Sequence, residues 1–227
     1  MSTSRTKEPQ YDVVFDLAQN EGLQTFGLMS SRAWRDDPRR LGFMLARYKF
    51  VARMMTGMPR VLEVGCADGF ATRVVRQAVG HVVATDFDPV FIQQNLAQPV
   101  GRWPVEYRVH NMAAGPLAEE FDGAYALDVL EHIPAAEEDA FLGNVARSLA
   151  PRGVCIIGMP SIHSQPYASP GSKAGHVNCK DEPGLRATMG RHFHNVFIFS
   201  MNDEVVHTGF TPMAHYLLAL ACGPKAR

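Results

Sequence analysis

The sequence predicts an α/β fold built on a seven-stranded, mostly parallel sheet with helices on both faces. From residue 60 onward, short runs rich in β-branched residues alternate with segments whose apolar residues recur at helical spacing. The first run ends in a turn with two glycines, RVLEVGCADGF at 60–70, as at the ligand-binding edge of an open α/β sheet. The last two runs have no evident helix between them, so we expect them to pair as an antiparallel hairpin.

Seven strands and four crossover helices are expected in this part of the chain. The strand segments are 60–64, 81–86, 105–110, 123–128, 153–160, 195–201 and 214–222. The helical segments are 70–79, 89–98, 135–150 and 181–193. Pro134 stands where a proline at the first helical position would, at the start of the third of these helices. The loop at 202–213 is long for a hairpin, which makes it a candidate wall of a binding site.

The residues before the first strand are expected to cap the same domain. Amphipathic spacing predicts a helix over about 39–55, and no Gly/Ser/Pro-rich linker separates it from the strands. We therefore expect a single domain over 1–227, with an N-terminal helical cap at 1–56 and a Rossmann-like core at 57–223. The N-terminus has no apolar signal-like region, and no stretch reaches the roughly 18 apolar residues of a membrane span, so no membrane partner is expected.

The composition narrows the class of partner and the compartment. The chain has 22 basic and 23 acidic residues and a net charge of −1. This balance does not suggest a nucleic-acid coat protein or a polybasic membrane binder. The four cysteines form no CxxC pair, and two lie in apolar runs, so they read as reduced core thiols. A cytoplasmic protein is expected, and its oligomeric state stays open.

The turn after the first strand has the features of a nucleoside site. Gly65 lets the backbone turn sharply, and Gly69 lets it approach a ligand closely. Asp86 ends the second strand, where a carboxylate can accept hydrogen bonds from both hydroxyls of a ribose. Because the turn itself contains an acid, Asp68, an anionic pyrophosphate is disfavoured. A nucleoside cofactor without a pyrophosphate is therefore expected.

Residues 63–69 resemble the ExGxGxG motif of class I S-adenosylmethionine-dependent methyltransferases. Ala67 stands where that family usually has its middle glycine, and Asn111 where it usually has aspartate. The resemblance extends over about 58–222, since the order of strands and the terminal hairpin are also those of the family. It implies S-adenosyl-L-methionine as cofactor, with Asp86 on the ribose and Asn111 beside the adenine. The residues it implies for cofactor binding are Glu63, Gly65, Cys66, Ala67, Gly69, Asp86, Phe87, Asn111, Met112 and Asp128.

A second motif, LDVLEHIP, follows the expected fourth strand, where methyl transfer needs its acceptor aligned. Asp128, Glu131 and His132 are spaced so that they can converge there as catalytic residues. Their side chains suit either a general base or a divalent ion. On the other interpretation the motif only begins a helix, with Glu131 and His132 capping it.

The same motif resembles the ExxEH segment of ubiquinone-biosynthesis O-methyltransferases and small-RNA 2'-O-methyltransferases. That resemblance implies a divalent metal ion held by Asp128, Glu131, His132 and a second histidine from beyond the fifth strand. His176 matches this fourth ligand, and His163 is the competing choice. Imidazoles with carboxylates suit Zn²⁺, Fe²⁺ or Mn²⁺, so the identity of the ion stays open.

The acceptor is expected to be small and anionic. Residues 31–60 contain eight arginines and lysines and two aspartates. The candidates to hold a phosphate or carboxylate are Trp34, Arg35, Arg39 and Arg40. A solvated face whose arginines pair with nearby acids is the alternative.

Together these features predict O-methylation of a small metabolite such as a sugar, a nucleotide-sugar or a natural-product intermediate. Two other functions stay open: a metal-free methyltransferase acting on nitrogen or on a macromolecule, and a non-catalytic module that only binds the cofactor. A nucleic acid is not the expected acceptor, because the chain has no recognisable RNA-binding module.

Overall fold

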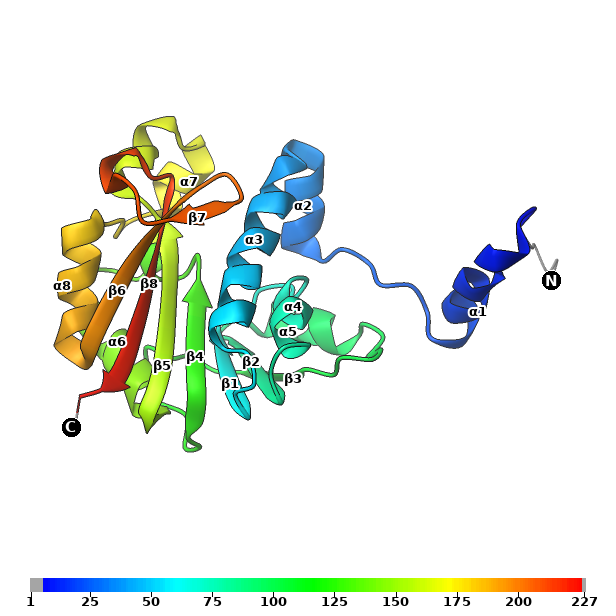
Figure 1. Ribbon diagram of the computed structural model, residues 1–227, viewed down its shortest axis with the longest axis horizontal. Coiled ribbons are helices and arrows are strands. Elements are labelled where there is room, and N and C mark those ends of the chain that lie inside the picture. Colours follow the sequence, from blue (N-terminus) through cyan, green and yellow to red (C-terminus); the bar gives the residue numbers. More distant parts are fainter. Residues whose placement is uncertain (1–5, 226–227) are drawn as a thin grey trace.

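The computed structural model describes residues 6–225, which form one mixed sheet with helices around it (Figure 1). The order of the eight strands in this part of the chain is β3-β2-β1-β4-β5-β8-β6-β7. The five strands β1 to β5 are parallel to their neighbours in the order β3-β2-β1-β4-β5. Strand β8 is antiparallel to both β5 and β6, and β7 is antiparallel to β6. The strands are β1 Arg60–Val64, β2 His81–Asp86, β3 Glu106–Val109, β4 Phe121–Leu127, β5 Leu149–Pro160, β6 Phe193–Asn202, β7 Val205–His207 and β8 Tyr216–Pro224.

The α/β fold class is confirmed, and so is the antiparallel pairing of the last two predicted strands, which are β6 and β8. The structure adds β7, which lies in the segment predicted to be a loop. Only three residues long, β7 is too short to show an alternating pattern in the sequence.

Helices cover both faces of the sheet, as predicted. The α-helices are α1 Asp12–Asn20, α2 Leu28–Asp36, α3 Arg39–Met54, α4 Thr72–Arg76, α5 Pro89–Leu96, α6 Glu138–Arg147, α7 Pro170–Gly175 and α8 Glu182–His192, with short 3-10 helices η1 Pro9–Tyr11, η2 Leu130–His132, η3 Ile162–Tyr167 and η4 Thr211–Met213. Alternate residues along each strand enter different apolar clusters, as the two-residue period of a strand requires. One cluster packs against α6 and α8, and the other against α3, α4 and α5.

The prediction for Pro134 is wrong. Helix α6 begins at Glu138, and the carbonyl of Pro134 accepts hydrogen bonds from the backbone N–H groups of Glu137 and Glu138. Pro134 therefore opens a separate turn before the helix and is not its first residue.

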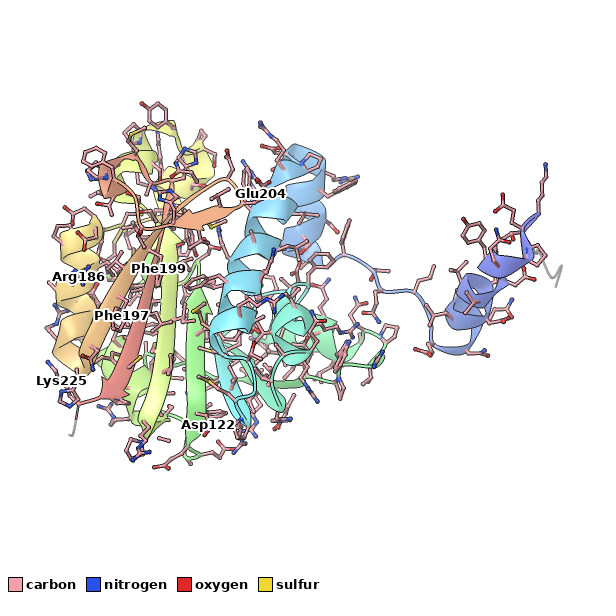
Figure 2. The ribbon with its side chains drawn as sticks, in the orientation of Figure 1. Asp122, Arg186, Phe197, Phe199, Glu204 and Lys225 are labelled. Carbon is pink, nitrogen blue, oxygen red and sulfur yellow. The ribbon has the colours of Figure 1, made fainter. Side chains whose placement is uncertain are left out.

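Only part of the predicted N-terminal cap packs on the domain. Helices α2 and α3 lie against it, whereas α1 extends away from it (Figure 1). Phe50 of α3 packs on Phe199 of β6 with ring centroids 5.1 Å apart, and Glu204 after β6 lies beside Gly42 (Figure 2). Within the predicted cap at 1–56, α3 thus packs on the sheet and α2 packs on α3. Residues 1–5 of that cap lie outside the described part of the chain. None of the described helices is both long enough and apolar enough to cross a membrane.

Candidate cofactor and metal site

The turn after β1 contains three residues in the left-handed region of φ: Gly65 at 77°, Ala67 at 45° and Gly69 at 61°. A Cβ on Gly65 would lie 2.3 Å from Cγ2 of Val129, and one on Gly69 would lie 2.7 Å from the hydroxyl of Tyr107. Both positions therefore need glycine for conformation and for space. Ala67 takes a left-handed φ at a cost of roughly 1 to 2 kcal/mol.

Asp86 joins the end of β2 to this turn. Its Oδ2 accepts a hydrogen bond from the N–H of Ala67 at 2.9 Å, and its Oδ1 accepts one from the N–H of Asp88 at 3.0 Å. The residue is 7% exposed. Each carboxylate oxygen keeps acceptor capacity beyond its backbone bond, so the arrangement leaves room for the predicted ribose hydroxyls.

The remaining predicted adenine-side residues differ in exposure. Phe87 is exposed, and Met112 is buried. Asn111 is exposed, with its Oδ1 accepting a hydrogen bond from the N–H of Ala113 at 3.0 Å. The side chain of Asn144 in α6 donates to the carbonyl of Met112 at 2.7 Å, which fixes this loop to the domain. Cys66 is buried too, and burial raises the pKa of its thiol.

Glu63, predicted to bind the cofactor, is enclosed beneath the turn. It is 1% exposed, and the hydroxyl of Tyr48 in α3 donates to its Oε1 at 2.7 Å. Burial raises the pKa of Glu63, and the hydroxyls of Thr72, Tyr48 and Tyr125 offset this only in part. Glu63 therefore anchors α3 under the turn, and its part in cofactor binding stays a prediction.

Residues 26–30, at the start of α2, contact the turn after β1, which the sequence did not predict. Asp68 accepts hydrogen bonds from the N–H of Ser30 at 2.7 Å and from its hydroxyl at 3.1 Å. A carboxylate is favourable there, because the first N–H groups of helix α2 have no partner within the helix. Phe26 packs edge-on against Phe70 with centroids 5.1 Å apart. The acid in the turn thus binds the start of α2 as well as disfavouring an anion.

Replacing Gly27 with alanine is expected to disturb this contact, because the new Cβ would lie 2.2 Å from Cβ of Asp68. Overpacking of this kind costs about 1 to 3 kcal/mol. Urea unfolding of the variant should show that loss. Gly190→Ala is the matched control, since a Cβ there meets nothing within 4 Å in helix α8, and it should be neutral or stabilising. Equal stability of Gly27→Ala and wild type would contradict this role of the contact.

The structure places Asp128 and Arg47 together at the end of β4. Nη1 of Arg47 donates to both carboxylate oxygens of Asp128, at 2.9 and 2.7 Å. Burial is the largest influence and alone would lower the pKa of Arg47, but the charge of Asp128, the Tyr216 hydroxyl and the hydrogen bond to Asp128 together outweigh it, and the pKa is raised. Asp128 has a φ of 57°, an uncommon conformation for a residue with a side chain. The pairing with Arg47 could not be read from the spacing of the motif.

Three of the four predicted metal ligands come together: Glu131, His132 and His176 each offer a ligand atom within 4.8 Å of the others. Asp128 is not in this group and pairs with Arg47, so its place in the four-ligand set stays a prediction; His163 is outside the group as well. Glu131 and His132 lie in η2 and cap no helix, so the capping interpretation of the motif is wrong.

The donor set fits a divalent transition metal. Glu131 is fully buried, and neither carboxylate oxygen has a hydrogen-bond partner. Burial, with a smaller effect of Asp128, raises the pKa of Glu131 well above its usual range. Nδ1 of His132 faces the carbonyl of Gly175 at 2.8 Å, and Nδ1 of His176 faces Oε1 of Gln165 at 2.9 Å. Bonds of this kind leave Nε2 of each ring as the ligand atom.

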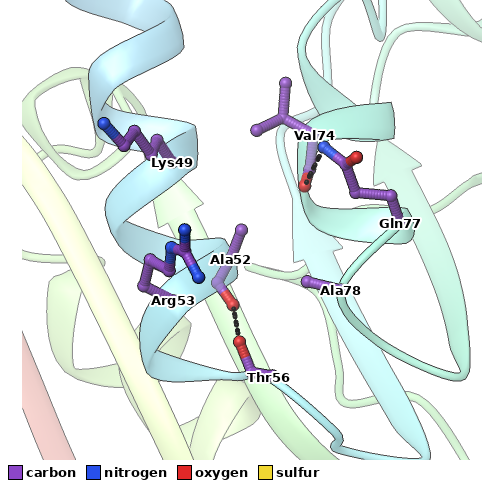
Figure 3. A pocket seen from close by; sticks show the side chains of 7 residues that line it. All are labelled: Lys49, Ala52, Arg53, Thr56, Val74, Gln77 and Ala78. Atoms are coloured by element: carbon purple, nitrogen blue, oxygen red, sulfur yellow. Dashed lines mark hydrogen bonds between the residues drawn. The ribbon is translucent and has the colours of Figure 1, made fainter.

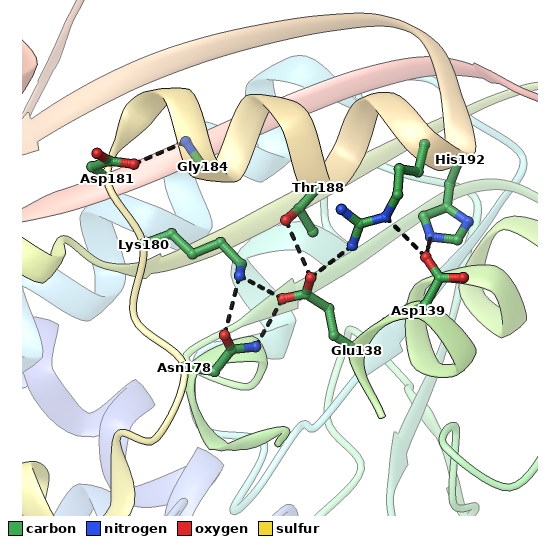
Figure 4. Close-up of polar contacts among 9 residues, drawn as sticks. Glu138, Asp139, Asn178, Lys180, Asp181, Gly184, Thr188 and His192 are labelled. Atoms are coloured by element: carbon green, nitrogen blue, oxygen red, sulfur yellow. Dashed lines mark hydrogen bonds and ion pairs between the residues drawn. The ribbon is translucent and has the colours of Figure 1, made fainter. Parts of the chain in front are cut away.

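A buried polar network holds the segment that supplies His176 (Figure 4). Oε2 of Glu138 accepts hydrogen bonds from Lys180 at 2.7 Å and Asn178 at 2.8 Å, and Oε1 accepts one from Arg191 at 2.8 Å. The backbone N–H groups of Val177 and Asn178 donate to the carbonyl of Glu131 at 2.8 and 3.0 Å. Glu138 therefore fastens residues 177–180 beside the three candidate ligands.

Replacing Glu138 with glutamine is expected to remove an acid-sensitive part of the stability. Burial opposes ionisation, but Lys180 and Asn178 outweigh it and lower the pKa of Glu138. Its contribution is thus present above the ordinary carboxyl pKa and is lost as the pH falls through the lowered value. The variant should lose about 2 kcal/mol at pH 7 and less at acidic pH, as measured by urea unfolding from pH 3 to 7.

Glu182→Gln is the control for this prediction, because its pair with Arg186 lies on the surface of α8 and contributes little. A loss of stability in Glu138→Gln that is the same at pH 3 and pH 7 would contradict the assigned ionisation.

A cavity of about 370 Å³ lies elsewhere, between α3 and α4 (Figure 3). No predicted site residue lines it. Its lining residues are Lys49, Ala52, Arg53, Thr56, Val74, Gln77 and Ala78.

The strand order, the glycine turn and the acid at the end of β2 define the fold of class I S-adenosylmethionine-dependent methyltransferases. Residues 62–157 match the family described as Methyltransferase domain, as the resemblance in the sequence predicts.

Similar proteins agree with this family. The ubiquinone biosynthesis O-methyltransferase of Xanthomonas axonopodis pv. citri (strain 306) is 29% identical over 138 residues, which are 58% of this chain and 57% of the relative. The chain thus matches little more than half the length of this curated relative.

Solved structures show the same fold. The N-methyltransferase NodS from Bradyrhizobium japonicum WM9, in complex with S-adenosyl-L-homocysteine, has a TM-score of 0.60 at 17% identity and covers 94% of this chain and 97% of its own. An S-adenosylmethionine-dependent methyltransferase from Clostridium acetobutylicum ATCC 824 has a TM-score of 0.68 at 8% identity and covers 87% and 98%.

Proposed function

We propose that the protein transfers a methyl group from S-adenosyl-L-methionine to an oxygen atom of a small, anionic metabolite, with a divalent metal ion bound at the site. The observation that carries the proposal is Glu131, whose two buried oxygens lack partners beside two imidazoles. An isolated buried carboxylate is costly, and a metal ion would offset that cost. The relative named as a ubiquinone biosynthesis O-methyltransferase supports oxygen as the acceptor atom.

In this proposal the glycine turn and Asp86 bind the nucleoside half of the cofactor. Gly65 and Gly69 let the backbone come close to it, Asp86 accepts the ribose hydroxyls, and Asn111 offers an oxygen to the adenine amine. Asp128 stands at the end of β4, between the cofactor and the metal ligands. The transfer is an in-line displacement at the methyl carbon, so these groups act mainly by orientation.

The acceptor hydroxyl must lose its proton as the methyl group arrives. A bound metal ion supplies Lewis acidity that lowers the pKa of such a hydroxyl. Glu131, His132 and His176 would hold that ion. Without it, the raised pKa of Glu131 suits this carboxylate to accept the proton itself.

The four free thiols support the proposed cytoplasmic location.

Turnover with a matched pair of acceptors tests the proposal. The purified protein is incubated with S-adenosyl-L-methionine and either 3,4-dihydroxybenzoate or 3,4-diaminobenzoate, and S-adenosyl-L-homocysteine is measured with the mass of the product. Methylation of the dihydroxy compound alone is expected. Methylation of the diamino compound alone would favour the nitrogen acceptor, and cofactor binding without turnover of any of a panel of sugars, nucleotide-sugars and phenols would favour the non-catalytic module.

A further inference from the structure

Arg47 lies in the basic segment 31–60, and its side chain is largely buried. Its guanidinium lies 3.8 Å from the ring centroid of the buried Tyr216, and its side chain is 19% exposed. The arginines predicted to bind an anion lie differently. Arg35 and Arg40 are exposed, and the exposed Arg39 pairs with Asp37.

The hydrogen bonds of this guanidinium are incomplete. Of its five N–H donors, only those on Nη1 are used, and both bonds go to Asp128. Nε is buried and has no partner, and Nη2 makes no bond to any described residue. A buried donor left in this state costs about 1 to 3 kcal/mol, so the arrangement favours a ligand that supplies the missing acceptor.

The location of this free edge joins it to the reaction. Arg47 reaches from α3 to Asp128, which stands three residues before the candidate metal ligand Glu131. The contact with the Tyr216 ring and the hydrogen bonds to Asp128 restrain the guanidinium. A planar carboxylate matches the Nε and Nη2 edge of a guanidinium in a two-bond, side-on pair.

We propose that Arg47 binds a carboxylate of the acceptor, next to the hydroxyl that receives the methyl group. This inference rests on the proposed function and narrows the anionic acceptor to a hydroxy acid. Arg47 is then the specificity-determining residue. It holds Asp128 through Nη1 while its other edge takes the substrate.

Binding of benzoate and benzamide tests this assignment, because they have the same shape and only benzoate is charged. Titration calorimetry is done on the protein saturated with S-adenosyl-L-homocysteine. Wild type should bind benzoate at least tenfold more tightly than benzamide. Arg47→Met should lose that preference, and Arg47→Lys should recover part of it, since lysine keeps the charge without the two-bond geometry.

Arg53→Met is the control, since Arg53 lies on the same helix and lines the separate cavity in Figure 3; it should behave as wild type. Thermal unfolding verifies that each variant is folded. The inference is overturned if wild type shows no preference for benzoate, if neither probe binds, or if folded Arg47→Met keeps the preference. A residue that only orients Asp128 would give this last result.

Turnover separates this inference from the proposed function. Methyl transfer to 3,4-dihydroxybenzoate without an Arg47-dependent benzoate preference keeps the proposed function and overturns the role of Arg47. An Arg47-dependent preference without methyl transfer to any phenol or other hydroxy acid keeps the anion site and overturns the proposed reaction.

Discussion

Replacing Glu131 with glutamine is expected to strip the purified protein of the divalent metal ion that we propose. The substitution removes the charged donor and keeps the side-chain volume, so the metal-to-protein ratio should fall at least tenfold in elemental analysis. His176→Ala should have the same effect, because it removes one of the two imidazoles. Methyl transfer should fall at least 100-fold in both variants, since Lewis acidity of this kind contributes several kcal/mol.

His163→Ala is the control. The sequence offers His163 as the other candidate for the fourth ligand, but it lies outside the cluster of ligand atoms. It should keep the metal. Glu131→Gln should fold at least as well as metal-free wild type, because it removes a carboxylate that is buried without a partner. Wild type that binds neither Zn²⁺, Mn²⁺ nor Fe²⁺ on addition, yet binds S-adenosyl-L-homocysteine, would leave Glu131 as a base and open the search to amine acceptors.

The sheet could be predicted because its signals are local. The central strands are short apolar runs, the crossover helices have their own spacing, and Gly65 and Gly69 mark the turn that follows the first strand. The sequence could not show in this way that α3 packs on the domain and α1 does not. Both are amphipathic, but α3 buries residues such as Val51 and α1 has no buried residue. Tertiary contact, not periodicity, makes that difference.

The candidate metal ligands could be predicted only through a resemblance, and the residues around them show why spacing was insufficient. His176 lies 45 positions after Glu131 and is brought there by a segment fastened to Glu138. Asp128 has the spacing of a ligand, but its carboxylate is taken by Arg47 from 81 residues away. Arg47 itself resembles any other arginine on an amphipathic helix until Tyr216 and Asp128 enclose it.

Replacing Asp86 with alanine is expected to weaken the binding of S-adenosyl-L-homocysteine by about 1 to 3 kcal/mol, or roughly 5- to 150-fold. Two effects contribute. The variant loses the charge-assisted hydrogen bonds to the ribose, and the N–H of Ala67 loses the acceptor that holds the turn in place. Titration calorimetry gives the change. Asp88→Ser is the control, since Ser keeps an oxygen for the N–H of Val90 at the start of α5, and its affinity should stay near that of wild type.

A ligand without the ribose hydroxyls separates the two effects of Asp86. Wild type should bind the 2',3'-dideoxy form of S-adenosyl-L-homocysteine less tightly than the parent, because Asp86 has lost its partners. Asp86→Ala should bind the two ligands with nearly equal affinity, since the ribose hydroxyls contribute little to binding once the carboxylate that accepts their hydrogen bonds is gone. If the two ligands instead differ by the same factor in both proteins, the ribose does not lie on Asp86. The carboxylate then acts only by holding the N–H groups of Ala67 and Asp88, and the hydroxyls must bind elsewhere along the edge of the sheet.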